Sequence, residues 1–378
     1  MNQEKLYLRT LGRLSELEKS GLRRQLRPRF GVDLCSNDYL GLSEHPLVKA
    51  AMCEAIQRLG CGATASRLLR GHFDEFSYVE RRFAEFKGTE AALFFSSGYA
   101  ANLGVLTTFP ESGDVVFSDS LNHASIIDAL RLSRATVKIY EHCNTDALAA
   151  RIAETPCIGQ RFLVTESLFS MDGDIAPLRE YVQLCKATDT VLIVDEAHAT
   201  GVFGKRGSGL LEELGVTEDC FVSINTAGKA LGVMGAFVAG PQWAIDYLVQ
   251  KARTLIFSTA PPPAVAVALS QAIEIVATQP KLRTELLSRA SLVRSELLAI
   301  GANVPQGRSQ IVPVILGKPE VALKVAGEFQ ARGYDVRAIR PPTVPPGTSR
   351  LRLSINLKIS EGQLKDFLHA ASDIMPRV

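Results

Sequence analysis

The sequence predicts an α/β fold: a large domain built on a mainly parallel β-sheet, followed by a smaller α+β domain. Three observations predict it. From about residue 47 to residue 240, short apolar runs rich in β-branched residues alternate with segments of helical spacing. The runs are apolar throughout, as in strands buried on both faces. Near residue 258 the alternation ends, and a long helical stretch with short strands follows. Alternation of this kind is typical of βαβ units in a parallel sheet.

The N-terminal segment, residues 1–30, predicts an amphipathic helix and a basic strap, because its charges are interspersed and it lacks the apolar core of a signal peptide. The strands of the sheet are expected to follow. They are the runs 92–97, 114–119, 137–142, 161–167, 190–197, 220–225 and 235–240. The segments between them, such as HASIIDALRLSR (123–134) and APLREYVQLCKATD (176–189), have the spacing of crossover helices.

The pattern changes at STAPPPAVA (258–266), where the C-terminal part begins. One long helix is expected over roughly 264–300. Short strands are expected at 311–317, 334–340 and 350–356, with a helix between the first two. The loop 341–349 carries four prolines, which stiffen it enough to frame a pocket. We therefore expect an N-terminal helix and strap over 1–45, a large domain over 46–262 and a small domain over 263–378.

Composition and charge exclude several classes of protein. The net charge of +2 provides no field for nucleic acid or a membrane surface, and no run of about 18 apolar residues predicts a transmembrane helix. The seven cysteines form no CxxC pair, which argues against disulfides and against a metal site. Idle thiols of this kind are typical of a reducing compartment, so we expect a cytoplasmic protein without a bound metal.

Residues 194–198 read VDEAH, and D-E-A-H is also the magnesium-binding box of a family of nucleic-acid helicases. A helicase needs the phosphate loop GxxxxGK[ST]. The Gly-Lys pairs, at 204–205, 228–229 and 317–318, are followed by Arg, Ala and Pro, so none of them fits. Residues 60–65 (GCGATA) resemble a dinucleotide fingerprint but follow a helical stretch instead of a strand. Neither GxSxG nor HExxH occurs, so serine-hydrolase and zinc-protease chemistry lacks support.

Lys229 and Asp195 are the two residues that indicate which type of reaction the protein catalyses. Asp195 ends the run TVLIVD, at the carboxyl edge of the predicted sheet, where ligands of open α/β sheets bind. Lys229 follows the buried run 220–225 and precedes the apolar stretch ALGVMGAF, so we expect its amine to lose hydration and its pKa to fall. Such a lysine suits a Schiff base. A Schiff-base lysine and an acid that keeps a pyridine nitrogen protonated are the requirements of pyridoxal phosphate (PLP).

Other residues would complete a PLP site. His198, in the glycine-bearing turn AHATGVFG, is placed to hydrogen-bond the phenolic oxygen of the ring. Gly98 and Tyr99 begin a helical run after a strand, so their free amides and the helix dipole suit a phosphate dianion. Thr226, three residues before Lys229, adds a hydroxyl near the same group. Each of these features alone is also explained as an ordinary turn.

His123 and Ser170 are two further candidates. His123 follows the run 114–119 and begins a helix, where it is either a cap or a residue that stacks on the pyridine ring. Ser170 lies in ESLFSMDGD after another strand, so its hydroxyl is a candidate contact to the ring, although turn chemistry also explains it.

Seven motifs taken together resemble the α-oxoamine synthases, which are PLP enzymes of the aspartate-aminotransferase fold (fold type I). They are SNDYLGL (36–42), SSGYAAN (96–102), NHAS (122–125), ESLFSMDGD (166–174), VDEAHATGVFG (194–204), GKALG (228–232) and RPPTVPPGTSRLRLS (340–354). The resemblance runs from about residue 30 to the C-terminus, and the order and spacing of the motifs make it specific.

The resemblance implies a role for each candidate residue. For the cofactor, Lys229 matches the Schiff-base lysine, Asp195 the pyridine partner, His123 the stacking histidine, His198 and Ser170 the ring-oxygen contacts, and Thr226, Gly98 and Tyr99 the phosphate site. The resemblance makes four of these residues catalytic: Lys229, Asp195, His123 and His198. For the substrates, Arg352 would bind the amino-acid carboxylate, and Arg340 and Arg23 would assist with carboxylate or acyl-chain recognition.

The resemblance also implies a reaction and a partner. The RPPTVP segment favours the branch that condenses L-alanine with a pimeloyl thioester, with loss of CO₂, to give 8-amino-7-oxononanoate in biotin biosynthesis. The branches that make 5-aminolevulinate, sphingoid bases and 2-amino-3-ketobutyrate fit this segment less well. Enzymes of this family are dimers whose active site is built by both subunits, so a homodimer is implied. The sequence leaves open whether the thioester carrier is coenzyme A or acyl carrier protein.

Three alternatives and two departures stay open at this stage. The chain could use glycine or serine with another acyl thioester, act as a plain aminotransferase, or serve as a silent regulatory subunit, although silent subunits lack the lysine. Many relatives carry a histidine where this chain has Phe76, and the small-residue run before Ser66 is here Ala63-Thr64-Ala65. These departures lie in a region that contributes to the partner subunit's site in relatives, so they bear on substrate selectivity.

Overall fold

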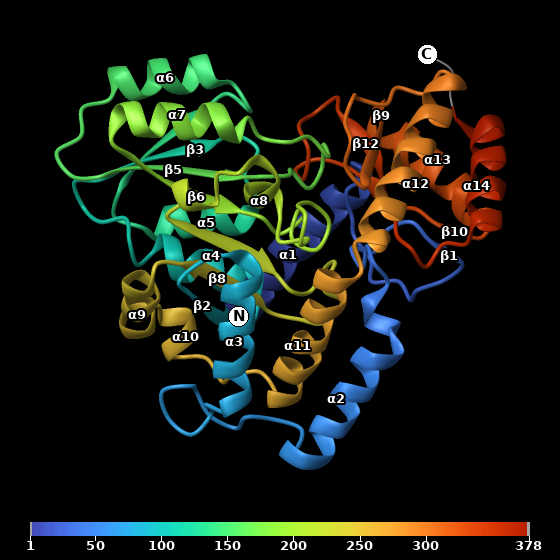
Figure 1. Ribbon diagram of the computed structural model, residues 1–378. Helices are drawn as coiled ribbons and strands as arrows, with labels where there is room; N and C mark the ends of the chain where they lie inside the picture. Colours follow the sequence, from blue (N-terminus) through green and yellow to red (C-terminus); the bar gives the residue numbers. More distant parts are fainter. Residues whose placement is uncertain (1, 376–378) are drawn as a thin grey trace. The chain divides into compact units, whose positions relative to one another are not determined.

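The computed structural model describes residues 2–375, and packing divides the chain into two compact units (Figure 1). Unit 1 comprises residues 1–36, 171–173 and 287–378, and unit 2 comprises residues 37–170 and 174–286. The sequence placed its boundaries after residues 45 and 262. It did not indicate that β1 (Val32–Asp33) pairs in parallel with β10 (Tyr334–Asp335), a pairing that joins the N-terminal segment to the C-terminal one.

The centre of unit 2 is a seven-stranded sheet with the strand order β2-β8-β7-β6-β5-β3-β4. Its strands are β2 (Ala91–Phe95), β3 (Val115–Asp119), β4 (Thr136–Tyr140), β5 (Arg161–Glu166), β6 (Thr190–Asp195), β7 (Val222–Thr226) and β8 (Ala236–Gly240). Only β8 runs antiparallel to its neighbours, β2 and β7. The seven predicted runs and the mainly parallel sheet are therefore confirmed. Because the carboxyl ends of β5, β6 and β7 lie at one edge, the loops that follow them meet there.

Helices cover both faces of this sheet. On one face α4 (Gly98–Leu106), α5 (Ala124–Leu132), α9 (Gln242–Lys251) and α10 (Arg253–Ile256) contribute to a single apolar cluster with the strands. On the other face α3 (Asp74–Lys87) packs its aromatic side chains on the sheet: the ring of Phe83 stacks on Phe237 with centroids 4.1 Å apart. Burial on both faces explains why most of the strands are rich in apolar residues; β4, at the edge of the sheet, is the largely exposed exception.

The remaining elements of unit 2 connect these layers. They are η1 (Leu42–Glu44), α2 (Pro46–Leu59), α6 (Thr145–Glu154), α7 (Leu178–Thr188), α8 (Leu210–Leu214), η2 (Thr217–Asp219) and α11 (Pro263–Thr278). Helix α11 packs against α2 and α3, and α7 packs against β6. The expected crossover helices at 123–134 and 176–189 are thus present as α5 and α7.

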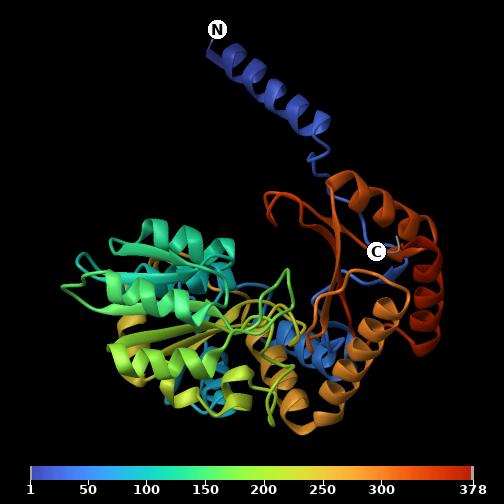
Figure 2. The same cartoon turned by 90° about the horizontal axis from the view of Figure 1, so that it is seen from above.

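Unit 1 contains a three-stranded antiparallel sheet with the order β11-β12-β9. Its elements are α1 (Asn2–Lys19), β9 (Ile311–Gly317), α13 (Pro319–Ala331), β11 (Ala338–Ile339), β12 (Ser349–Ser354) and α14 (Glu361–Ile374), and α12 (Pro280–Ala299) enters it from unit 2. Figure 2 shows α1 as a helix with no neighbouring element of unit 1 along most of its length, and its described side chains are exposed. Within residues 2–375 no helix is long and apolar enough to cross a membrane.

Two expectations for the C-terminal part are wrong in detail. The single helix expected over 264–300 is two helices, α11 and α12, which break at Gln279 before Pro280 because proline cannot continue a helix. The single strand expected over 334–340 is two short ones, β10 and β11, which pair with different partners.

Candidate active site

The carboxyl edge of the sheet in unit 2 brings together Asp195, His123 and Lys229. Asp195 is the last residue of β6, His123 precedes α5, and Lys229 lies in the loop between β7 and β8. The charges of Asp195 and Lys229 both act on the pKa of His123, so the three residues share one electrostatic environment. The pattern that singled them out in the sequence is therefore matched by their positions in the fold.

Asp195 is held by two hydrogen-bond donors. Its Oδ2 accepts from Nδ2 of Asn102 on α4 at 2.7 Å, and its Oδ1 accepts from the backbone N–H of Ala197 at 2.8 Å. The carboxylate is 5% exposed and has no ion-pair partner in the part of the chain that the structure describes. A buried carboxylate that is hydrogen-bonded but lacks a cation suits a protonated pyridine nitrogen, which is positively charged.

Asn102 extends this contact to the histidine. Its Nδ2 also donates to Oγ of Ser125 at 3.0 Å, and the same Oγ lies 2.7 Å from Nδ1 of His123. The backbone N–H of Ser125 also donates to Nδ1 of His123, so this nitrogen acts as an acceptor and the proton of the neutral ring belongs on Nε2. Partial desolvation lowers the pKa of His123, Asp195 opposes this effect and Lys229 adds to it. A neutral, exposed imidazole is suited to stack on a cationic ring.

His198 lies between Lys229 and a tyrosine that the sequence did not single out. Its Nε2 is 2.8 Å from Nζ of Lys229, and its Nδ1 is 2.7 Å from Oη of Tyr39. Tyr39 is fully buried and His198 is 4% exposed. The resemblance assigned His198 to a ring oxygen, and the structure adds a direct contact with Lys229.

The N-terminus of α4 forms a small cradle beside β7. Gly98 is the first residue of α4, and the Oγ of Ser97 accepts from the backbone N–H of Ala100. A Cβ atom on Gly98 would lie 2.6 Å from Oγ1 of Thr226, so only glycine leaves room there. The amides of Gly98 and Tyr99, the helix dipole and the Thr226 hydroxyl form a donor set that fits a phosphate dianion.

Glu166, at the end of β5, is a second carboxyl group in the site. It is opposite Asp195 in the parallel register, is 3% exposed, and its Oε1 has no hydrogen-bond partner among the described residues. Burial and then the charge of Asp195 raise the pKa of Glu166 to about 8, although Lys229 opposes the shift. Glu166 is therefore mainly protonated at neutral pH, and it adds little negative charge beside Asp195.

Ser170 and the three predicted substrate arginines have different positions. Ser170 lies in the loop after β5 and belongs to unit 2. Arg352, on β12, belongs to unit 1, is 8% exposed and donates from Nη1 to Oγ of Ser354 at 2.8 Å. Arg23 and Arg340, also in unit 1, both line a cavity of about 590 Å³. Arg352 does not line it.

The departures from the family pattern fall on packing positions of unit 2. Phe76 is fully buried; its ring stacks on Phe94, and the guanidinium of Arg67 lies 5.0 Å above it. Thr64, within the Ala-Thr-Ala run, has a positive φ of 61°, which is uncommon for a residue with a branched side chain. Phe76 therefore acts as a core residue in this unit.

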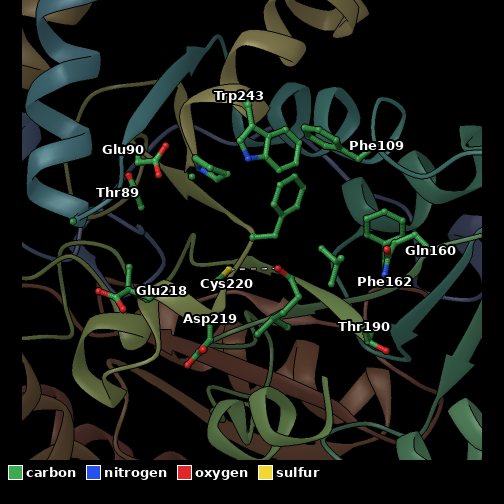
Figure 3. Close-up of a pocket in the computed structure, with 17 residues that line it drawn as sticks. Thr89, Glu90, Phe109, Gln160, Phe162, Thr190, Glu218, Asp219, Cys220 and Trp243 are labelled. Atoms are coloured by element: carbon green, nitrogen blue, oxygen red, sulfur yellow. Dashed lines mark hydrogen bonds between the residues drawn. The ribbon is translucent and has the colours of Figure 1, made fainter. Parts of the chain in front are cut away.

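One cavity in unit 2 lies away from these residues. It has a volume of about 800 Å³, and Gln160 and Thr190, beside the amino ends of β5 and β6, line it together with the aromatic side chains of Phe109, Phe221 and Trp243 (Figure 3). Asp195 ends the opposite edge of the same strands. No predicted site residue lines this cavity.

One cluster in unit 2 has the residue types of a metal site. Asp119, His142 and Cys143 have potential ligand atoms within 4.8 Å of one another. Both nitrogens of His142 are already engaged: Nδ1 with Asp119 at 2.8 Å and Nε2 with Asp174 at 2.7 Å. Burial opposes the charge, but these carboxylates outweigh it and raise the pKa of His142 to about 12. A doubly protonated imidazole cannot bind a metal, so the cluster is better described as an ion-paired histidine.

Asn102, Ser125, Tyr39 and Glu166 are site residues that the sequence reasoning missed. Each lies inside one of the motifs that carry the family resemblance, namely SSGYAAN, NHAS, SNDYLGL and ESLFSMDGD. Their membership in these motifs was the available signal. Their partners could not be inferred, because the contacts join segments that are 23 to 159 residues apart.

Comparisons with known proteins identify the family of the chain. The family model for aminotransferases of class I and II matches residues 30–370. The chain is 46% identical to 8-amino-7-oxononanoate synthase of Anaeromyxobacter dehalogenans (strain 2CP-1) over 377 residues, covering 96% of this chain and 94% of that one. It is 42% identical to 8-amino-7-oxononanoate synthase of Geobacter sulfurreducens, covering 96% and 97%.

Solved structures also resemble the chain. A serine palmitoyltransferase from S. paucimobilis with a bound PLP–myriocin aldimine has a TM-score of 0.91 at 30% identity, and the match covers 97% of this chain and 96% of that one. The 8-amino-7-oxononanoate synthase from Francisella tularensis has a TM-score of 0.78 at 29% identity, covering 91% and 97%. The fold is therefore of a known kind.

Proposed function

The chain belongs to the aminotransferase class I and II family and is a PLP-dependent enzyme of fold type I, and on that premise we propose that it condenses L-alanine with a pimeloyl thioester. The products would be 8-amino-7-oxononanoate, CO₂ and the free thiol, in biotin biosynthesis. The observation that carries the proposal is the 46% identity, over nearly the whole chain, to a protein named for this product. The RPPTVP segment and the contacts of Lys229 support the same reaction.

The residues of unit 2 would hold the cofactor. The amides of Gly98 and Tyr99 and the hydroxyl of Thr226 would bind its phosphate, and Asp195 would pair with the pyridine nitrogen. His123 would stack on the ring, and His198 and Ser170 would contact its oxygen. When bound, PLP supplies an electron sink for negative charge that develops at Cα of the amino acid.

Lys229 would carry the proton transfers. Its amine would hold the cofactor, and as a free base it would take the proton from Cα of alanine and later return one to the product. His198 Nε2, at 2.8 Å, can hold the proton that Lys229 must lose before it acts as a base. Asp195, fixed by Asn102 and the Ala197 amide, would keep the opposite end of the ring protonated.

Arginines of unit 1 would recognise the anionic substrates. We assign the carboxylate of alanine to Arg352, and Arg340 and Arg23 to the carboxylate or acyl chain of the thioester. Two observations support the second assignment: both arginines line one cavity with Arg24, and burial together with the like charge of Arg24 lowers the pKa of Arg340. Such crowding of positive charge is stable when an anion neutralises it. Arg23 is already paired with Glu18 at 2.5 Å, so Arg24 is the stronger addition to this set.

We also propose that the active enzyme is a homodimer with an active site shared between subunits. An apolar stripe on α1 supports this, because these side chains are exposed in a single copy. It comprises Leu6, Tyr7, Leu8, Leu11, Leu14 and Leu17. Light scattering would give the oligomeric state. The cytoplasmic location predicted from the sequence stays a prediction.

The test is product formation. Purified protein with PLP, L-alanine and pimeloyl-CoA should yield 8-amino-7-oxononanoate by mass spectrometry, and the same thioester on acyl carrier protein should be compared in parallel. The Lys229→Ala variant should abolish turnover, and near-full activity in this variant would overturn the role of Lys229. Absence of product from both thioesters would reject the proposed acyl substrate.

A second reaction of the same class is supported by the serine palmitoyltransferase structures, which resemble the chain at 30% identity. In that case glycine or serine would replace alanine, with a different acyl thioester. The absorbance of the bound cofactor should then respond to glycine or serine more strongly than to alanine. A panel of amino acids and acyl thioesters would decide between the two.

A further inference from the structure

We propose that Tyr39 is a positioning residue that holds His198 in the tautomer able to accept a proton from Lys229. The proposal rests on the proposed function and adds a residue to its site. It gives a role to the motif SNDYLGL, to which no role has been assigned so far. It concerns only residues of unit 2, which are joined by direct contacts.

Three hydrogen bonds form a chain with one direction. The Oη of Tyr39 donates its single proton to Oδ1 of Asn37 at 3.1 Å. The same Oη lies 2.7 Å from Nδ1 of His198, and with its proton directed to Asn37 it accepts there. In this arrangement, which is part of the proposal, Nδ1 of His198 carries a proton. In the neutral ring Nε2 is then a lone pair, and it faces Nζ of Lys229 at 2.8 Å.

This tautomer determines what His198 can do for Lys229. An ammonium group has only donors, so it needs an acceptor such as an unprotonated Nε2. When the proton moves from Nζ to Nε2, one N–H bond breaks and one forms; the products are a neutral amine and an imidazolium. Both N–H groups of the imidazolium are then held, by Nζ of Lys229 and by Oη of Tyr39. The neutral amine is the form that attacks a carbonyl group and removes protons.

Burial makes the loss of this hydroxyl costly. Tyr39 is 0% exposed and His198 is 4% exposed, so water is poorly placed to replace Oη as the acceptor. Without it the Nδ1 proton loses this acceptor, which shifts the ring towards the Nε2–H tautomer. That tautomer would point an N–H group at the ammonium of Lys229, where two donors face each other. Tyr39→Phe should therefore impair proton acceptance while it conserves the shape of the side chain.

The first test reads the tautomer in the protein without cofactor. Protein labelled with ¹⁵N-histidine contains six histidines, and the His198→Gln variant assigns the resonances of His198. Long-range ¹H–¹⁵N spectra should show Nδ1–H for His198 in the wild type and a shift towards Nε2–H in Tyr39→Phe. The matched control is Tyr181→Phe, which removes a buried hydroxyl that interacts with Tyr140 and not with His198. The control should keep the wild-type tautomer.

The second test reads the amine of Lys229. Absorbance follows the rate at which the unlabelled apo protein attaches PLP. This rate should fall by about tenfold or more in Tyr39→Phe at neutral pH. It should recover as the pH rises, because the amine then loses its proton to solvent. The titratable groups around Lys229 are Asp195, Glu166, His123 and His198. All four are retained in the variant, so the change would belong to Tyr39.

The outcomes separate this inference from the proposed function. An Nε2–H tautomer in the wild type, or the same tautomer population in wild type and Tyr39→Phe, would overturn the inference even if 8-amino-7-oxononanoate is formed. The expected tautomers without that product would leave the role of Tyr39 intact and reject the alanine and pimeloyl assignment. The wild-type spectrum alone is decisive if the variant does not fold.

Discussion

Asn102 offers the sharpest test of how the fold prepares Asp195 for the cofactor. The Asn102→Leu substitution keeps the shape of the side chain and removes the amide that donates to Asp195 at 2.7 Å and to Ser125 at 3.0 Å. We expect the affinity for PLP to fall, because the carboxylate loses one of its two donors and part of its orientation. His123 loses the link through Ser125 at the same time.

The size of the effect follows from the contacts. A hydrogen bond to a charged group contributes about 1.5–3 kcal/mol. Since about 1.4 kcal/mol is a tenfold change, the dissociation constant of PLP should rise by roughly 10- to 150-fold. Stability should fall as well, because the buried carboxylate of Asp195 loses a donor in the apo protein, and this loss is partly offset because leucine removes the Oδ1 of Asn102, which is buried without a hydrogen-bond partner among the described residues.

Equilibrium dialysis of PLP against the apo protein measures the dissociation constant, and thermal unfolding of the same apo protein measures stability. The matched control is Asn356→Leu, which removes a buried amide that donates to the carbonyl oxygen of Asp33 and makes no contact with Asp195. The control should lose stability and keep its affinity for PLP. A PLP affinity in Asn102→Leu within twofold of the wild type would refute the reasoning.

Three further predictions concern buried charges. Lys87→Met leaves Glu196 buried without its cation and should lower the free energy of unfolding by roughly 3–5 kcal/mol in urea titrations, with most of the loss recovered when Glu196→Gln is added; an equal loss in both variants would contradict the charge argument. The pKa of Glu166 is raised from 4.5 to about 8, so the unfolding free energy should fall as pH rises between these values, and Glu166→Gln should flatten that window; an unchanged slope would show that another group causes it. The pKa of His142 is raised from 6.5 to about 12, so its stabilisation is complete below pH 6.5 and is lost as pH rises towards 12; His142→Asn should therefore destabilise the protein most near pH 6 and progressively less towards pH 10 in thermal melts, and a loss independent of pH would argue for packing alone.

The positions of most strands could be predicted from the sequence because these strands are buried on both faces, whereas β4, at the edge of the sheet, is largely exposed. Runs such as FLVTE and VLIVD carry no polar alternation, and only a covered parallel sheet accommodates them. The antiparallel direction of β8 was beyond this reasoning, since direction is set by connection length and packing instead of by composition. The break between α11 and α12 had a visible signal in Pro280, which the helical spacing on both sides obscured.

The candidate site also contains residues that could be predicted from the sequence and residues that could not. Lys229 and Asp195 could be predicted because each follows an apolar strand, a position where a charged group needs a chemical reason. Asn102 and Ser125 could not, because their roles exist only when α4 and α5 pack on the same face of the sheet and present one residue each to Asp195 and His123. The sequence therefore indicated the residues that we propose to react and missed the residues that contact them.

Three carboxyl groups lie at the carboxyl ends of β5 and β6, and each has a different environment. Glu196 forms an ion pair with Lys87, and both side chains are fully buried. Glu166 is kept mainly protonated at neutral pH by burial and by its neighbour Asp195. Asp195 has two hydrogen-bond donors and no ion-pair partner within residues 2–375. If all three were ionised and unpaired, their mutual repulsion would raise every pKa and spread the negative charge. Neutralising two of them concentrates it on Asp195, where a protonated pyridine ring would need it.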